Sequence, residues 1–344
     1  MRVELGEVCE RGSSNLKQSD VSKMNGKYPI YGASGYIGNV DFYHQDQPYV
    51  AVVKDGAGIG RTTLHPAKSS VIGTMQYLLP KENILPEYLF YVVKYMHLEK
   101  YFTGATIPHI YFKDYQHEEF NLDPIEKQVK IVTVLKKCEK IIDDRKKEMQ
   151  LLDDLIKARF VEMFGDVIHN DRKWECQQFS DITTSRLGKM LDTKHQTGTC
   201  KYPYLANFNV QWFRFELGNL NEMDFNEKER EEFCLEDGDL LVCEGGEIGR
   251  CAVWHNQIKK CFFQKALHRV RCNQDIILPD YLSWWFKYNC ENGGFTAIEG
   301  AKATISHLTG TKMKMLDVTV PPIELQEQFV DIIHQVDKSK FSFP

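Results

Sequence analysis

The sequence lacks any uninterrupted apolar run of the roughly 18 residues that a membrane-spanning helix requires, so it predicts no membrane partner. Its first seven residues carry no apolar signal core either, which favours a cytoplasmic location. Ten cysteines are present, but none of them forms a CxxC pair. We therefore expect reduced, mostly buried thiols and no metal site, with a zinc site from the 243–272 region as the weaker alternative.

An excess of positive charge is also absent. The chain of 344 residues has 43 Lys and Arg against 48 Asp and Glu, which gives a formal net charge of −5. Because phosphate contact requires basic side chains, this balance argues against a protein that coats nucleic acid without regard to sequence. It leaves open a DNA-binding protein whose basic residues gather on one face.

Known catalytic motifs are missing as well. The sequence has no Asn-Pro-Pro-aromatic run, no His-Glu-x-x-His, no Gly-x-Ser-x-Gly and no Gly-Lys-Ser/Thr phosphate loop. Asp331, Asp337 and Lys338 could imitate a nuclease triad, but they lie on the charged side of an expected helix. We therefore expect a protein that is not an enzyme and that binds no cofactor of its own.

What the sequence does contain is an internal repeat. Four short blocks occur twice in the same order: Ile-Gly-Arg, Leu-Pro-Glu/Asp-Tyr-Leu, Gly-Ala followed by Thr-Ile, and Pro-Ile-Glu-x-Gln. In the first half they are residues 59–61, 85–89, 104–107 and 124–128; in the second half they are 248–250, 278–282, 300–305 and 322–326. Chance could produce one such pair but hardly an ordered set, so the pattern indicates a tandem duplication.

Both copies are expected to fold alike, in the α+β class. A mixed α/β domain rich in short β-branched and aromatic runs comes first, over residues 1–123 and 172–321. A helix follows each domain, over residues 124–165 and 322–344. Pro124 at the start and Gly165 at the end are typical of helix boundaries.

The first of these helices has one narrow apolar stripe between charged residues. A helix of about 40 residues is roughly 60 Å long, and such a stripe needs a partner helix, as in a coiled coil. The obvious partner is the second helix, although its shortness predicts incomplete pairing; a linker helix lying on one domain is the alternative. The stripe residues are Ile125, Val129, Val132, Leu135, Ile142, Met149, Leu152 and Ile156 in the first helix, with Phe329, Ile332 and Val336 in the second.

The two glycine-rich segments, 55–60 and 244–249, invite a comparison with nucleotide-binding loops. Such loops require a helix directly after the glycines, whereas strand-forming residues follow here in both copies. Tight turns between strands are therefore predicted, and they expose Lys54 and Arg61 in one copy and Arg250 in the other. Arginine suits guanine or phosphate contact, but each Arg could equally pair with a local carboxylate.

Further candidates for DNA contact are polar or aromatic residues of expected loops. Each of them could instead be an ordinary solvated surface residue. They are Tyr31, Ser34, Thr106 and His109 in the first copy, and Arg186, Lys189, Asn207, Asn209, Trp212, Lys302 and Thr304 in the second.

The order of the duplicated blocks resembles that of the specificity subunits of type I restriction–modification systems. The resemblance implies that each domain is a target-recognition domain that reads one half of a split site on double-stranded DNA. It also implies that the helices form an antiparallel coiled coil, which docks two modification subunits. S-adenosylmethionine would be bound by those adenine-methylating partners, and ATP and Mg²⁺ by a separate restriction subunit with motor and nuclease activity.

The resemblance also sets geometric expectations. A helix of roughly 60 Å matches at most about 18 base pairs, so two half-sites separated by an unread gap are expected. The half-sites should differ, because the two copies diverge outside the blocks and residues 219–232 have no evident counterpart. The short second helix puts docking of one modification subunit in doubt. Two other functions remain open: the DNA-recognition part of a stand-alone restriction or modification enzyme, and an interaction scaffold that does not bind DNA.

Overall fold

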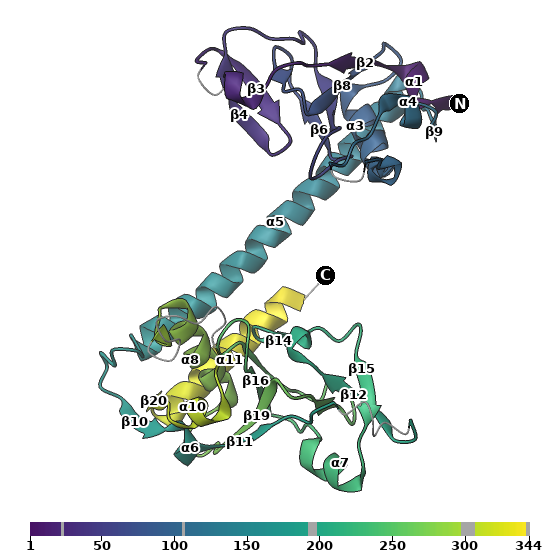
Figure 1. Ribbon diagram of the computed structural model, residues 1–344. Coiled ribbons are helices and arrows are strands. Elements are labelled where there is room, and N and C mark those ends of the chain that lie inside the picture. The colour runs from purple at the N-terminus through teal and green to yellow at the C-terminus, as the bar shows by residue number, and fades with distance from the viewer. Residues whose placement is uncertain (22–23, 105–106, 192–197, 297–306, 342–344) are drawn as a thin grey trace. The chain divides into compact units, whose positions relative to one another are not determined.

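The computed structural model describes the chain except for residues 22–23, 105–106, 192–197, 297–306 and 342–344 (Figure 1). It divides into two compact units, Met1–Arg145 and Lys146–Pro344, within the long helix α5 (Ile125–Phe164). The candidate residues Thr106, Lys302 and Thr304 lie outside the described residues.

Unit 1 is built on an antiparallel sheet of four strands in the order β2-β8-β5-β6. Strand β5 has the sequence Tyr-Val-Ala-Val-Val, and all five residues are buried. An apolar run without polar positions is expected of a strand that is covered on both faces. The strands are β2 (Cys9–Ser13), β8 (Met75–Pro80), β5 (Tyr49–Val53) and β6 (Thr62–His65).

A smaller sheet and a helix cover the two faces of this central sheet. Val50 and Val52 pack with Leu89 of α3 (Pro86–Tyr95) on one side. On the other side, Ala51 and Val53 pack with the small sheet, whose order is β4-β3-β7 and in which β3 and β7 run parallel. Its strands are β3 (Tyr28–Gly32), β4 (Gly35–Val40) and β7 (Ser70–Val71).

Short elements complete unit 1. Strand β1 pairs with β9 in an antiparallel manner and brings the start of the chain next to the start of α5. The remaining elements are β1 (Arg2–Glu4), α1 (Leu5–Val8), α2 (Gln18–Val21), the 3-10 helix η1 (Leu98–Tyr101), α4 (Phe112–Tyr115) and β9 (Glu119–Asn121).

Unit 2 repeats the central sheet and the small sheet of unit 1 strand for strand. Its central antiparallel sheet has the order β11-β19-β16-β17, and its small sheet has the order β15-β12-β18 with β12 and β18 parallel. The predicted duplication is thereby confirmed at the level of the fold. The strands are β11 (Thr183–Leu187), β12 (Lys201–Leu205), β15 (Asn221–Asp224), β16 (Leu240–Cys243), β17 (Cys251–Val253), β18 (Phe262–Phe263) and β19 (Leu267–Cys272).

Helix α7 (Glu227–Phe233) and the hairpin of β13 (Val210–Gln211) and β14 (Arg214–Phe215) in unit 2 have no equivalent among the described parts of unit 1. The expectation that residues 219–232 lack any counterpart was wrong in part, because β15 occupies the place of β4. The remaining elements are β10 (Glu175–Gln178), α6 (Phe179–Ile182), η3 (Asn207–Asn209), α8 (Pro279–Glu291), α10 (Gly310–Lys314), β20 (Asp317–Val320) and α11 (Ile323–Phe341).

Within unit 2, the last part of α5 packs against α11. The rings of Phe160 and Phe329 lie 5.5 Å apart, and Lys340 Nζ lies 2.8 Å from an Asp153 carboxylate oxygen. The contact nearer to the start of α5, at Asp153, is made by the later residue of α11, Lys340, so the two helices are antiparallel. The predicted pairing is confirmed for this part of α5, with Ile156 and Val336 also in the shared core.

A buried glutamine fastens each of these helices to its own unit. Gln128 accepts a hydrogen bond from the N–H of Leu85 at 2.9 Å and donates to the carbonyls of Asn83 and Asp123. Gln326 makes the equivalent bonds, to Leu278 N–H at 2.9 Å and to two carbonyls. Leu85 and Leu278 precede α3 and α8, so the amide joins two of the repeated sequence blocks.

His65, at the end of β6, is a buried histidine with an expected effect on stability. Only 6% of it is exposed, and its ring centroid lies 4.3 Å from that of Tyr31. Burial lowers its pKa to about 4, because the charged imidazolium is poorly solvated there. The unfolded chain binds this proton near pH 6.5, so the free energy of unfolding should fall as the pH drops from about 6.5 to about 4, by up to about 1.4 kcal/mol per pH unit.

The comparison of His65→Gln with the parent protein isolates this contribution. Urea unfolding of both proteins between about pH 7 and about pH 5 should show a weaker pH dependence in the variant. His97→Gln is the matched control, because His97 is exposed. Equal pH dependence in the parent and in His65→Gln would show that His65 titrates normally.

Candidate nucleic-acid interface

The glycine-rich segment of unit 1 is a tight turn between β5 and β6. Val53 N–H donates to Arg61 O and Gly60 N–H donates to Val53 O, both at 2.9 Å. Gly58 and Gly60 have φ values of 89° and 80°, a region that residues with a Cβ rarely adopt. A strand and not a helix follows the turn, as predicted, so this segment has no helix N-terminus with which to hold a phosphate.

The arginine that ends each glycine turn holds a neighbouring loop. Arg61 donates to the carbonyl of Ala33 at 2.9 Å, and Arg250 donates to the carbonyl of Asn207 at 3.0 Å. Both carbonyls follow the middle strand of the small sheet, so the contact is the same in the two units. The partner is a backbone carbonyl and not the local carboxylate that the sequence suggested as the alternative to DNA contact.

The two arginines differ in what they leave available to a ligand. Arg61 is exposed and makes one hydrogen bond to Ala33. Arg250 is half-buried and also donates to the side-chain oxygen of Asn207 at 3.2 Å. Asn207 in turn donates to the carbonyl of Gly245 at 3.1 Å, which closes a small network around this turn. Arg61 is therefore the better placed of the pair for contact with a phosphate or a base.

A second loop of unit 1 is tied to the same turn. His109 Nδ1 lies 2.6 Å from Asp55 Oδ1, and Lys54 Nζ lies 3.6 Å from the other carboxylate oxygen. Unit 2 repeats the backbone part of this link, since Leu308 N–H donates to Glu244 O just as Ile110 N–H donates to Lys54 O. The structure thus brings together two of the predicted contact residues, Lys54 and His109, on either side of Asp55.

Tyr31 lies in β3, and Ser34 lies in the turn after this strand, next to the carbonyl of Ala33 to which Arg61 donates. Tyr31 is half-buried, and burial together with the nearby Tyr36 hydroxyl raises the pKa of its own hydroxyl. Ser34 is exposed. The sequence did not single out Phe102 and Tyr111, two large exposed side chains near the glycine turn.

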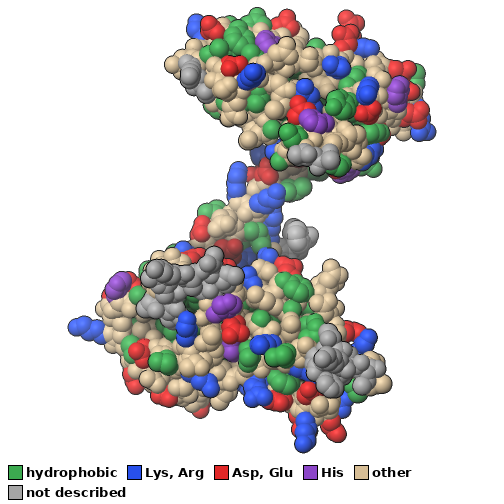
Figure 2. Space-filling view, in the orientation of Figure 1, with side chains coloured by type: hydrophobic (Ala, Val, Ile, Leu, Met, Phe, Trp, Pro, Cys, Tyr) green, Lys and Arg blue, Asp and Glu red, His purple; other side chains and the backbone are tan. Residues whose placement is uncertain are grey.

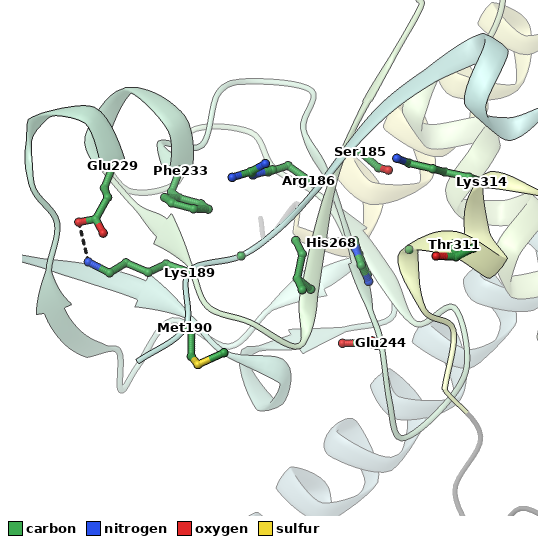
Figure 3. A pocket seen from close by; sticks show the side chains of 13 residues that line it. Ser185, Arg186, Lys189, Met190, Glu229, Phe233, Glu244, His268, Thr311 and Lys314 are labelled. Carbon is green, nitrogen blue, oxygen red and sulfur yellow. Dashed lines mark hydrogen bonds and ion pairs between the residues drawn. The ribbon is translucent and has the colours of Figure 1, made fainter. Parts of the chain in front are cut away.

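In unit 2, Arg186 and Lys189 hold the added helix α7. Lys189 Nζ donates to Glu229 and to the carbonyl of Asp224, both at 2.6 Å, and Arg186 pairs with Glu232. Both cations also line a groove of about 910 Å³ (Figure 3). Their charge is therefore largely matched within the unit.

Asn209 and Trp212 serve the fold of unit 2. Asn209 is 1% exposed and uses both ends of its amide, accepting from Ala206 N–H at 2.9 Å and donating to Glu216 O at 2.8 Å. The Trp212 ring packs under the ammonium group of Lys287 at 4.6 Å.

Charge is mixed over the surface of each unit. Figure 2 shows basic and acidic side chains interspersed on the visible face of both units. Among the described residues, no helix is long and apolar enough to cross a membrane. No group of three or more His, Cys, Asp or Glu suited to a metal ion occurs within the same part of the chain.

Two repeated units with a common turn, loop and helix arrangement define a tandem recognition module, and sequence comparison identifies its family. The family model for the type I restriction modification DNA specificity domain matches residues 1–152 and again residues 171–343. The chain therefore belongs to this family and carries the domain twice.

Two relatives are named as specificity subunits. A type I restriction enzyme specificity subunit of Haemophilus influenzae is 20% identical over 348 residues, which cover 97% of this chain and 86% of that protein. The MjaIX specificity subunit of Methanocaldococcus jannaschii is 26% identical over 124 residues, which cover 30% of this chain and 29% of that protein.

Two solved structures share the fold. The S subunit of a type I restriction–modification system from M. genitalium matches with a TM-score of 0.63 at 13% identity, over 99% of this chain and 90% of that chain. A chain from a structure of type I system assembly and conformational transition matches with a TM-score of 0.54 at 14% identity, over 99% and 91%.

Proposed function

We propose that this chain is the non-catalytic specificity subunit of a type I restriction–modification complex. Each unit reads one half of a bipartite site on double-stranded DNA. The duplicated topology with diverged loops carries this proposal, since two copies of one scaffold with different loops suit two different half-sites. S-adenosylmethionine, ATP and Mg²⁺ would then be needed only by partner subunits.

In unit 1, we place the DNA contact at the glycine turn and the two loops tied to it. This region presents cationic, hydroxyl and aromatic groups that suit phosphate and base contacts. Its residues are Tyr31, Ser34, Lys54, Arg61 and His109.

Arg61→Ala is expected to weaken DNA binding by about 1–3 kcal/mol if the guanidinium contacts a base. Its side chain is exposed and makes one hydrogen bond among the residues that the structure describes, so the melting temperature should change little. The measurement is binding of the assembled complex to its target at several salt concentrations. Lys68→Ala, at an exposed position of the same unit, is the control. If Arg61→Ala and the parent bound DNA with equal affinity, Arg61 would have only a structural role, the hydrogen bond to Ala33.

The modification subunits are proposed to dock on an exposed apolar patch of α5. The patch consists of three β-branched apolar residues, Val134, Ile141 and Ile142, which are 58%, 67% and 53% exposed. Clustered apolar side chains on an exposed helix surface indicate a binding site for another protein. The stripe residue Val129, which is 49% exposed, lies nearer to the start of the same helix. Such a patch suits a protein partner, and adenine methyltransferase subunits are the expected one.

Ile141→Asp should reduce co-purification of the modification subunits at least about tenfold, since a buried charge at an interface costs more than about 1.4 kcal/mol. The fold should be unaffected, because the side chain is exposed. Lys140→Asp, the adjacent exposed position, is the control. Normal complex formation by Ile141→Asp would place the docking surface elsewhere.

The function as a whole is tested by expressing the chain with its modification subunits in a cell free of DNA methylation and mapping the methylated adenines. A single motif of two conserved blocks separated by an unread gap is expected. If the chain binds no methyltransferase and directs no methylation, an interaction scaffold becomes the better description. Methylation by the chain alone would favour the stand-alone enzyme.

A further inference from the structure

The groove of unit 2 lies between β11, the segment that follows it, α7 and the start of α10. Figure 3 shows Lys189 and Glu229 on one side of it and Thr311 and Lys314 on the other. Lys314 is exposed at the rim. With a volume of about 910 Å³, the groove is large enough for one nucleotide of a DNA strand, and Lys314 supplies the basic side chain that phosphate contact requires.

His268 of β19 lines this groove without a hydrogen-bond partner for one ring nitrogen. The residue is 4% exposed, and its Nε2 makes no hydrogen bond to any residue that the structure describes. Its ring lies against the first turn of α10, where a Cβ on Gly310 would approach His268 Cε1 to 3.1 Å. A buried polar atom left without a partner costs about 1–3 kcal/mol, so this one calls for an explanation.

The chemistry of His268 suits recognition of a neutral polar group. Burial lowers its pKa, so the ring is neutral at physiological pH. A neutral imidazole has one donor and one acceptor nitrogen, as base edges do. The groups that face it are Glu244, which raises that pKa, and Lys314, which lowers it.

The equivalent position of unit 1 supports a role in recognition. His268 is paired with Val242 across the central sheet, and Gln76 is paired with Val52 at the same register position of unit 1. Gln76 is also 4% exposed, and its Nε2 likewise makes no hydrogen bond within the described part of the chain. Two copies of the fold thus carry different hydrogen-bonding side chains at one place, which is what two different half-sites require.

We infer that this groove is a DNA-reading site of unit 2, in which His268 is a specificity-determining residue and Lys314 contacts a phosphate. A nucleotide of the target strand enters the groove and, after a small shift of the buried His268 side chain, completes the hydrogen bonding of the imidazole. This inference rests on the proposed function, since it assumes that unit 2 reads one half-site.

The decisive variant is His268→Gln, which gives unit 2 the side chain that unit 1 carries at this position. The variant is expressed with the modification subunits, and the methylated adenines are mapped. We expect a changed or relaxed base preference in one half of the motif and no change in the other half. His255→Gln, an exposed histidine of the same unit, should leave the motif unaltered. An unchanged motif with His268→Gln, or a change in both halves, overturns the inference.

A rim variant keeps the test decisive if His268→Gln does not fold. Lys314→Ala alters an exposed side chain and should weaken binding to all DNA sequences alike. The slope of log K against log salt concentration should fall in magnitude by about one, because one phosphate contact is lost. Lys259→Ala, exposed in the same unit, should leave both unchanged. An unchanged affinity and salt dependence with Lys314→Ala also overturns the inference. Absence of any methylated motif with the parent chain would instead refute the proposed function.

Discussion

Replacement of Phe160 by alanine is expected to lower the free energy of unfolding of unit 2 by about 3–5 kcal/mol. Phe160 is 1% exposed and lies where α5, α8 and α11 meet. Its ring centroid lies 5.1 Å from that of Phe164, 5.9 Å from that of Tyr281 and 5.5 Å from that of Phe329. Truncation therefore opens a cavity that three elements line, and such a site cannot close without moving a helix.

Tryptophan fluorescence makes this measurement specific to unit 2. All five tryptophans of the chain lie after residue 146, so denaturant unfolding followed by their emission reports on that unit. Val161→Ala is the matched control, because the neighbouring Val161 is 40% exposed and should cost less than about 1 kcal/mol. A loss below about 1 kcal/mol in Phe160→Ala would mean that α5 is not part of the core of this unit.

Gln326→Leu is expected to cost unit 2 about 2–4 kcal/mol, because it removes three hydrogen bonds from a fully buried site. Leucine fills a similar volume but leaves the N–H of Leu278 and two carbonyls without this partner. The same change at Gln128, which is equally buried, should have a similar effect in unit 1.

Tryptophan-monitored unfolding measures the effect of Gln326→Leu, and amide hydrogen exchange of α3 measures that of Gln128→Leu. Gln328→Leu is the control, since Gln328 is exposed on the same helix. If Gln326→Leu were as stable as Gln328→Leu, the repeated Pro-Ile-Glu-x-Gln block would need an explanation other than fastening the helix.

The fold was largely predictable because the duplication is visible in the sequence. The repeated blocks mark turns and helix starts, and the long helix was expected over residues that form α5. The reason for the blocks was not predictable. Gln128 and its partner Leu85 are 43 residues apart, and a local pattern contains no information on such a contact.

The candidate site was less predictable, because the partner of each cation comes from a distant segment. Arg61 meets a carbonyl 28 residues away, and Lys189 meets Glu229 40 residues away on a helix that unit 1 does not share in its described part. No sequence motif indicated the groove at His268, because a histidine on the buried face of a strand looks the same in sequence as any core residue.

The central claim is that two copies of one scaffold read two halves of a DNA site, and selection of bound DNA from a random pool tests it most directly. The complex of this chain with its modification subunits should enrich two short conserved blocks separated by a gap of fixed length. Arg61→Ala should then weaken selection in one block only. Enrichment of a single uninterrupted block, or of no sequence, would contradict the account.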